Sequence, residues 1–231
     1  MIQLFTRHKR TASAIVLTLI CESFISVSYA QTDFVSRDTI LKFGIIEPIY
    51  FSSENFVGDT IEGYEAKKVL LSAEAASALA LVEAELAHGG FGLKVLDGYR
   101  PQIAVDHFLK WSKISSDTVG KSRYYPNVPK DQLFVKGYIA EKSGHSRGSA
   151  VDLTLFDLAT GKELDMGSIV DHFGPISHPE TKNVSAVQHK NRQLLRNAMI
   201  KAGFEPLETE WWHFVLINEP YPNTYFRFPV K

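Results

Sequence analysis

The sequence has a single cysteine, almost no net charge and no hydrophobic run long enough to span a bilayer. One cysteine among 231 residues allows no intrachain disulfide and no cysteine-rich zinc module. The sequence has 25 Lys and Arg residues and 26 Asp and Glu residues. This balance argues against electrostatic binding to nucleic acid or anionic lipid. No long charge run occurs and 12% of residues are aromatic, which excludes disorder for most of the chain.

Three common catalytic signatures are also absent. The chain contains no G-x-S-x-G nucleophile elbow, no phosphate-binding P-loop and no G-x-G-x-x-G dinucleotide fingerprint. These absences argue against serine hydrolase, nucleotide hydrolase and dinucleotide chemistry. No repeat, low-complexity stretch or linker-like composition follows Gln31, so residues 31–231 are predicted to form one domain.

The first 30 residues are typical of a secretory signal peptide. Basic side chains lie between residues 7 and 10, a short apolar run covers 12–21, and Ser28-Tyr29-Ala30 supplies small residues for cleavage. We expect cleavage after Ala30, an exported periplasmic or secreted protein, and no stable membrane association afterwards. The alternative is an uncleaved anchor, against which the shortness of the apolar run argues.

The remaining chain mixes strand and helix patterns without a strict alternation. This mixture favours an α+β domain with a small, mostly antiparallel sheet over a doubly wound one. Apolar spacing, capping residues and glycine stops predict helices at 72–88, from Pro101 onward, at 131–140 and at 188–202, and strands at 93–96, 150–155 and 211–217. The polar and aromatic segment 115–129 is expected at the surface.

The stretch 143–152, SGHSRGSAVD, places a histidine in a glycine-rich loop and an aspartate in the apolar strand that follows. Burying Asp152 is costly unless its charge meets a cation, a metal or several donors. Gly144 and Gly148 allow a tight turn that returns His145 to Asp152. Imidazole nitrogen with carboxylate oxygen suits zinc. The alternative is a core aspartate bonded to loop amides, with His145 merely exposed.

Glu210 and His213 lie three residues apart among large aromatic side chains. A second histidine would complete a His-Asp-His set, and three protein ligands leave the open position of a catalytic zinc site. Glu210 could then take a proton from the bound water and pass it to a leaving amine. Positions three apart on a regular strand face opposite sides, so Glu210 should precede the strand or lie at a bulge. The alternative is an aromatic core strand with a hydrogen-bonded histidine.

A third group, DGYRP at 97–101, presents Arg100 in a turn after a buried strand. The planar guanidinium donates two parallel hydrogen bonds, which suits a carboxylate or a developing oxyanion. The alternative is an arginine that pairs with Asp97 and holds the turn.

The three groups together, in this order, resemble the VanX-type D-alanyl-D-alanine dipeptidases. These are zinc peptidases of the group that includes D,D-carboxypeptidases and the hedgehog fold. The resemblance extends to 122–127, to KGY at 136–138 and to EPYPN at 219–223, and it covers about Ile46 to Lys231. The combination of S-x-H-x-x-G-x-A-x-D with E-x-x-H is far more specific than either part.

The resemblance implies a role for each of the matching residues. His145, Asp152 and His213 would bind one zinc ion per chain. Glu210 would act as general base and then acid, and Arg100 would stabilise the tetrahedral oxyanion. The implied reaction is hydrolysis of the D-alanyl-D-alanine dipeptide to two D-alanines, as part of cell-wall peptide metabolism.

Three further positions follow from the resemblance as parts of the substrate pocket. Ser143 would help to hold the substrate carboxylate, Asp171 would bind the free amino group, and Tyr50 would line the same small pocket. The sequence departs from the family just after Tyr50, where Phe51-Ser52-Ser53 stands in place of an expected aromatic residue.

The sequence leaves two alternative functions open. One is a D,D-carboxypeptidase or endopeptidase on peptidoglycan stem peptides, which export would suit and an open groove would favour. The other is a zinc-stabilised binding module without turnover, against which the presence of both Glu210 and Arg100 argues. Unlike the cytoplasmic resistance enzyme of the family, an exported dipeptidase would act in wall turnover or scavenging.

Overall fold

The computed structural model describes residues 33–36 and 41–231 of the chain. The chain divides into two compact units, Met1–Phe34 and Val35–Lys231, and the second contains all the candidate site residues. The predicted signal peptide, residues 1–30, lies outside the described residues. No helix in the described part of the chain has both the length and the apolar character needed to cross a membrane.

The described chain contains short strands, three longer helices and several single turns of helix. The strands are β1 (Phe34–Ser36), β2 (Ile45–Ile46), β3 (Leu70–Ser72), β4 (Phe91–Asp97), β5 (Ala150–Asp157), β6 (Phe204–Leu207) and β7 (Glu210–Leu216). The α-helices are α2 (Ala73–His88), α3 (Gln102–Ser112), α4 (Lys121–Tyr124) and α5 (Ala186–Lys201). The 3-10 turns are η2 (Ile49–Phe51), η3 (Lys130–Gln132), η4 (Gly144–Arg147) and η5 (Pro175–Ser177).

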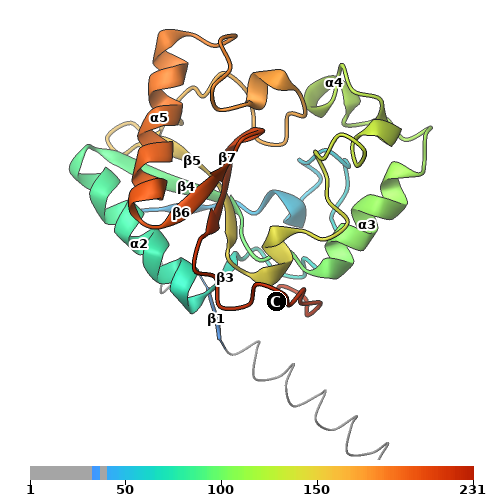
Figure 1. Cartoon of the computed structure of the whole chain (residues 1–231), viewed down its shortest axis with the longest axis horizontal. Helices are drawn as coiled ribbons and strands as arrows, with labels where there is room; N and C mark the ends of the chain where they lie inside the picture. The colour runs from blue at the N-terminus through green and yellow to red at the C-terminus, as the bar shows by residue number, and fades with distance from the viewer. Residues whose placement is uncertain (1–32, 37–40) are drawn as a thin grey trace, which may run out of the picture. The chain divides into compact units, whose positions relative to one another are not determined.

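A five-stranded sheet in the order β2-β4-β5-β7-β6 forms the centre of the domain (Figure 1). β2 runs parallel to β4, and every other neighbouring pair in this sheet is antiparallel. A separate two-stranded sheet pairs β1 with β3. The predicted α+β class with a small, mostly antiparallel sheet is confirmed.

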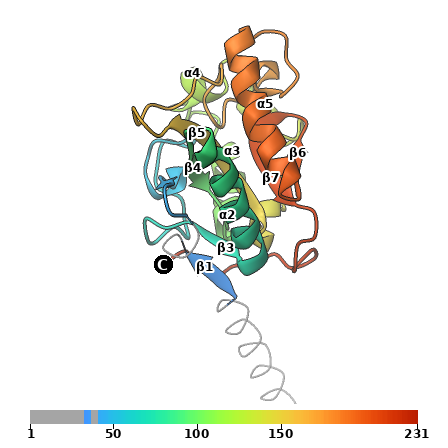
Figure 2. The same cartoon turned by 90° about the vertical axis from the view of Figure 1, so that its left-hand side faces the viewer.

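Helices α2 and α5 lie side by side against one face of the central sheet, and α3 and α4 lie on its other side (Figures 1 and 2). The main core fills the space between α2, α5 and the sheet, with members such as Leu79, Leu153, Leu195 and Trp212. Because both faces are covered, β5 is buried along almost its whole length. Each such buried leucine contributes roughly 1.5–3 kcal/mol of transfer free energy.

Local capping explains where the two long helices begin. The Ser72 side chain accepts a hydrogen bond from the Ala75 amide, as an N-cap should. Ser185 and Gln188 form a reciprocal capping box at the start of α5. α5 therefore begins at Ala186, two residues before the sequence pattern suggests. Pro101 is the N-cap residue of α3 and lies just before its first helical position.

One expectation for the middle of the chain was wrong, and another was right only in part. The helix predicted at 131–140 is limited to the turn η3, and the chain then reverses at Gly137, whose φ is 76°. Most of segment 115–129 lies at the surface as expected, but Tyr124 and Tyr125 are buried. These aromatic side chains pack inward through ring contacts such as Trp111 with Tyr125.

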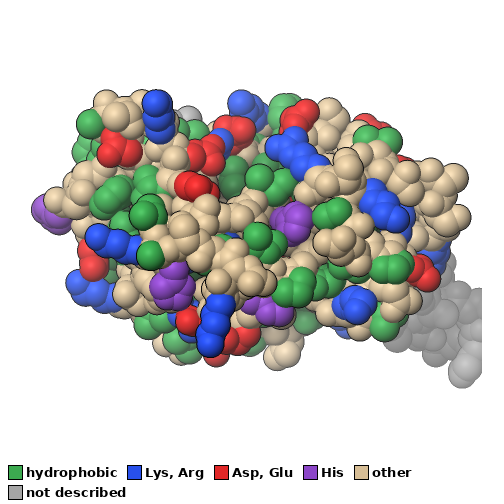
Figure 3. Space-filling model, turned by 90° about the horizontal axis from the view of Figure 1, so that it is seen from above, with side chains coloured by type: hydrophobic (Ala, Val, Ile, Leu, Met, Phe, Trp, Pro, Cys, Tyr) green, Lys and Arg blue, Asp and Glu red, His purple; other side chains and the backbone are tan. Residues whose placement is uncertain are grey.

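One face of the protein carries both signs of charge in close mixture. Figure 3 shows one face on which basic, acidic and hydrophobic side chains are interspersed, without a large area of one kind. This pattern agrees with the near-zero net charge of the sequence.

Candidate metal centre and active site

Strand register brings the first candidate ligands together. Asp152 on β5 pairs directly with His213 on the antiparallel strand β7. On its other side Asp152 pairs with Asp97, at an irregularity where β4 ends. Three acid or imidazole side chains therefore meet where three neighbouring strands lie next to one another.

The glycine-rich loop delivers His145 to the same place. Ser143 caps the turn η4 by accepting a hydrogen bond from the His145 amide. Gly148 ends the turn at φ 83°, a left-handed conformation that favours glycine. His145 is 2% exposed, and its Nδ1 lies 2.7 Å from the carbonyl oxygen of Gly98. The predicted return of His145 to Asp152 is thus observed.

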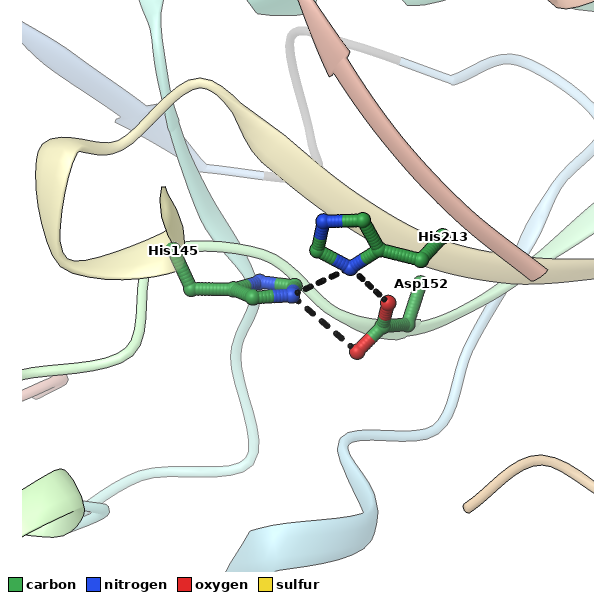
Figure 4. Close-up of side chains that lie close together, drawn as sticks. All are labelled: His145, Asp152 and His213. Carbon is green, nitrogen blue, oxygen red and sulfur yellow. Dashed lines mark hydrogen bonds and ion pairs between the residues drawn. The ribbon is translucent and has the colours of Figure 1, made fainter. Parts of the chain in front are cut away.

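The donor atoms of His145, Asp152 and His213 point toward one another (Figure 4). His145 Nε2 lies 3.1 Å from His213 Nδ1 and 3.2 Å from Asp152 Oδ2. His213 Nδ1 lies 2.9 Å from Asp152 Oδ1. Ligand atoms held about 2.0–2.1 Å from a tetrahedral zinc ion are about 3.3 Å apart. The separations in this cluster are close to that value.

Proton positions also favour a cation in this cluster. The Gly98 carbonyl can only accept, so Nδ1 of His145 carries the proton and Nε2 presents a lone pair. That lone pair faces a carboxylate oxygen of Asp152. The two atoms repel each other unless a cation or a proton lies between them. Burial lowers the pKa of His213, which favours the neutral, metal-binding form of its ring. The donor set therefore fits a metal ion such as zinc.

Glu210 reaches the cluster because β7 is irregular at its start. Glu210 is the first residue of β7, and the pairing with β6 shifts between Pro206 and Leu207. Leu207 faces Glu210 while Pro206 faces Phe214, so β7 carries extra residues at this point. The predicted position before the strand or at a bulge is confirmed. It lets Glu210 and His213 face the same cavity.

Arg100 forms two contacts with buried carboxylates. Its Nε donates to Asp97 at 2.9 Å, and its Nη2 donates to Asp152 at 3.3 Å. Its guanidinium carbon also lies 4.8 Å from the centre of the Tyr50 ring, within cation–π range. Asp97 is held in turn by the Tyr64 hydroxyl at 2.7 Å. Arg100 therefore holds the turn and also faces the cavity.

Tyr50 and Asp171 are directly bonded although they lie far apart in the sequence. The Tyr50 hydroxyl donates to Asp171 Oδ2 at 2.8 Å, and both side chains are buried. Asp171 has a φ of 60°, a left-handed conformation that few residues other than glycine, asparagine and aspartate adopt. Burial, reinforced by the negative charge of Asp152, raises the pKa of Asp171 to about 7.

All eight candidate residues line a single cavity of about 220 Å³: Tyr50, Arg100, Ser143, His145, Asp152, Asp171, Glu210 and His213. Aromatic side chains complete its wall, among them Phe56, Phe108, Tyr138 and Phe173. Sequence periodicity places Phe108 on the apolar face of α3, but no local signal shows that this face borders a site. A larger groove of about 920 Å³ elsewhere on the domain includes none of the eight among its lining residues.

The cavity is electrostatically unusual because carboxylates dominate it. Burial raises the pKa of Glu210 well above its usual range, and the charges of Asp152 and Asp171 raise it further. Burial also opposes the charge of Asp152, but attraction to His145 and His213 holds its pKa below the usual range. A site with these properties favours proton transfer at Glu210 and binding of positive charge near Asp171.

Comparison with known proteins agrees with this geometry. A family model described as D-Ala-D-Ala dipeptidase, of the M15 peptidases, matches residues 30–231. Proteins named D-alanyl-D-alanine dipeptidase from Enterococcus faecium and Streptomyces coelicolor are each 43% identical to the chain. The matches cover 79% and 78% of this chain and 90% of each relative. A relative of the same name from Escherichia coli is 33% identical, over 74% of this chain and 78% of its own length. The chain therefore belongs to the D-Ala-D-Ala dipeptidase family of M15 peptidases.

Proposed function

We propose that this protein is a zinc-dependent dipeptidase that hydrolyses D-alanyl-D-alanine to two D-alanines. The observation that carries the proposal is the joint placement of all eight candidate residues around one small cavity. At about 220 Å³ this cavity is smaller than the roughly 300–1,000 Å³ of typical ligand pockets. A free dipeptide fits such a space better than a peptidoglycan stem peptide does.

His145, Asp152 and His213 are the residues proposed to hold the zinc ion. A zinc ion bound there would keep one position for water and would lower the pKa of that water toward about 7. The hydrogen bond between His145 and the Gly98 carbonyl orients the imidazole and fixes its tautomer.

Glu210 is proposed to move the proton. Its carboxylate accepts a proton from the attacking water and returns it to the amine of the departing D-alanine. The positive charge of a zinc ion bound at Asp152 would favour the ionised form of Glu210 that accepts the proton. Burial, which raises the pKa of Glu210, then allows the carboxyl group to retain the proton until the leaving amine takes it. Arg100, which already faces the cavity, donates to the oxygen of the peptide carbonyl as charge develops there.

The two charged ends of the dipeptide are assigned to different side chains of the cavity. Asp171, with Tyr50 bonded to it, is proposed to receive the free ammonium group. Ser143 is proposed to hold the carboxylate through its hydroxyl group. A peptide with a blocked N-terminus would leave Asp171 buried without a cation, which disfavours its binding.

The test compares two substrates with the purified, zinc-loaded protein. We expect release of D-alanine from D-alanyl-D-alanine and little or none from N-acetyl-D-alanyl-D-alanine. Preferential cleavage of the acetylated peptide would make the protein a D,D-carboxypeptidase. Zinc binding without cleavage of either compound would support a binding module. Glu210→Gln is the matched control, because it should retain zinc and lose turnover.

We also propose that the protein is exported and acts on cell-wall peptides outside the cytoplasm, either in wall turnover or in scavenging. The support is the composition of residues 1–30. Cell fractionation followed by N-terminal sequencing tests this point. A mature chain that begins at Gln31 outside the cytoplasm is the expected result. An intact chain found only in the cytosol would contradict it.

A further inference from the structure

We propose that Arg192 is a positioning residue that sets the specificity of the enzyme for a free amine. It does so by clamping segment 166–178, which carries Asp171. This inference rests on the proposed function, because it assumes that Asp171 receives the substrate ammonium. Arg192 lies on α5 and does not line the cavity.

The guanidinium of Arg192 bonds to both ends of the segment. Its Nε donates to the Met166 carbonyl at 2.6 Å, and its Nη2 lies 3.4 Å from the Ser168 hydroxyl, a weak contact. On the far side of Asp171, its Nη1 donates to the His178 carbonyl and its Nη2 to the Ile176 carbonyl, each at 3.0 Å. One side chain thus fixes where the segment enters and where it leaves.

The environment of Arg192 is unusual for a cation. Arg192 is 1% exposed, and within the described residues no carboxylate is close enough to form an ion pair with it, although the more distant charge of Asp165 attracts it. Buried charges are normally paired, because an isolated charge in a protein interior is strongly disfavoured. Here backbone carbonyl oxygens of a single segment take the place of the carboxylate. Arginine suits this role, because it presents several N–H groups in one rigid plane.

The clamped segment needs such support at its centre. Asp171 combines a left-handed φ of 60° with a buried carboxylate, and both are disfavoured. A second tie reaches the same segment from β7, where the Trp211 indole donates to Ser168 at 2.9 Å. Trp211 directly follows Glu210 in the chain, so Ser168 connects the clamp to the strand that carries the proposed base.

The test measures kcat and KM for D-alanyl-D-alanine and the preference for it over the N-acetylated dipeptide. In Arg192→Met we expect KM for the free dipeptide to rise about ten- to hundredfold, the effect of losing one charge-assisted hydrogen bond. We expect kcat to change much less and zinc content to stay the same. The preference for the free amine should fall by about the same factor as KM rises.

A double-mutant cycle separates positioning from a general loss of structure. If Arg192 acts through Asp171, the double variant should have the KM of Asp171→Asn alone, because the second change removes nothing further. Leu79→Ala is the matched control. It removes buried volume on α2 and should lower thermal stability without changing the substrate preference. If Arg192→Met does not fold, Ser168→Ala should show a smaller effect in the same direction.

Hydrogen exchange supplies a readout that does not depend on turnover. Amides of 166–178 should exchange faster in Arg192→Met than in the wild-type protein, while those of α2 should not. The proposal would be overturned if hydrogen exchange of this segment or KM stayed unchanged in Arg192→Met. It would also be overturned if the effects of Arg192→Met and Asp171→Asn on KM multiplied independently in the double variant. A wild-type protein that leaves the free dipeptide intact would refute the proposed function instead, and the exchange measurement would still decide whether the clamp exists.

Discussion

Asp171 should make the metal-free protein less stable as the pH rises. Its side chain is 4% exposed, and its carboxylate accepts a hydrogen bond from the neutral hydroxyl of Tyr50. Burial, with a further contribution from the charge of Asp152, raises its pKa to about 7. The folded state therefore prefers the protonated form over a pH range in which the unfolded chain is ionised.

The size of the effect follows from the two pKa values. A change from the ordinary 3.8 to about 7 corresponds to about 4 kcal/mol, since one pKa unit is worth roughly 1.4 kcal/mol. Between these two values the folded state binds more protons than the unfolded state, so the free energy of unfolding decreases as pH rises. The full contribution of Asp171 is present below pH 3.8 and is lost once the pH passes about 7. That loss is a large part of the roughly 5–15 kcal/mol of a typical domain.

Asp171→Asn is the appropriate perturbation. Asparagine tolerates the left-handed backbone conformation and can accept the same hydrogen bond from Tyr50. Urea unfolding of the metal-free protein and of the variant, from pH 4.5 to pH 8, gives the difference between their free energies of unfolding. We expect this difference to grow in favour of the variant by about 3 kcal/mol between pH 4.5 and pH 8, because the first part of the change lies below pH 4.5. A difference that stays constant with pH would refute the reasoning. Zinc beside Asp152 should reduce the effect, because it offsets one of the two causes of the raised pKa.

Three further predictions concern the reaction and the metal. Glu210→Gln should lower kcat about 10²–10⁴-fold and should retain zinc. Steady-state kinetics and metal analysis test both points, and a wild-type rate would exclude Glu210 as the base. Arg100→Lys should lower kcat about 10²–10³-fold, because an ammonium group cannot bridge Asp97 and Asp152 and still face the carbonyl. Zinc at 100 times its dissociation constant should stabilise the protein by about 2.7 kcal/mol, or roughly 5–10 °C in Tm. Asp152→Asn should abolish most of that increase in a thermal melt, and an equal increase in the variant would place the zinc elsewhere.

Residues whose signal is local were predicted well from the sequence. Ser72 caps α2 as expected, because N-capping depends on a few adjacent residues. The bulge at Glu210 was also predictable, since a glutamate and a histidine three apart cannot face one cavity from a regular strand. The turn at Gly137 was missed, because the residues around it also fit a helical pattern.

Contacts between distant segments were beyond reasoning from the residues alone. The Tyr50–Asp171 hydrogen bond joins residues 121 positions apart, and only the resemblance to a family pointed to both. Arg192 gave no signal, because one more cation in an amphipathic helix looks like part of its solvated face. Its burial depends on how segment 166–178 folds over α5, which is a property of the tertiary structure.

The charge balance of the cavity explains why a free amine and a metal ion belong together in this site. Asp152, Asp171 and Glu210 all face the cavity, and Arg100 is the only lysine or arginine among its lining residues. A divalent cation at Asp152 and an ammonium group at Asp171 each add positive charge where the protein supplies too little. An acylated peptide brings no such charge, so above about pH 7, where Asp171 is ionised, it is disfavoured by electrostatics as well as by the small volume. Enlarging the cavity alone should therefore not produce a carboxypeptidase above this pH, because the ionised Asp171 would still lie buried without a cation.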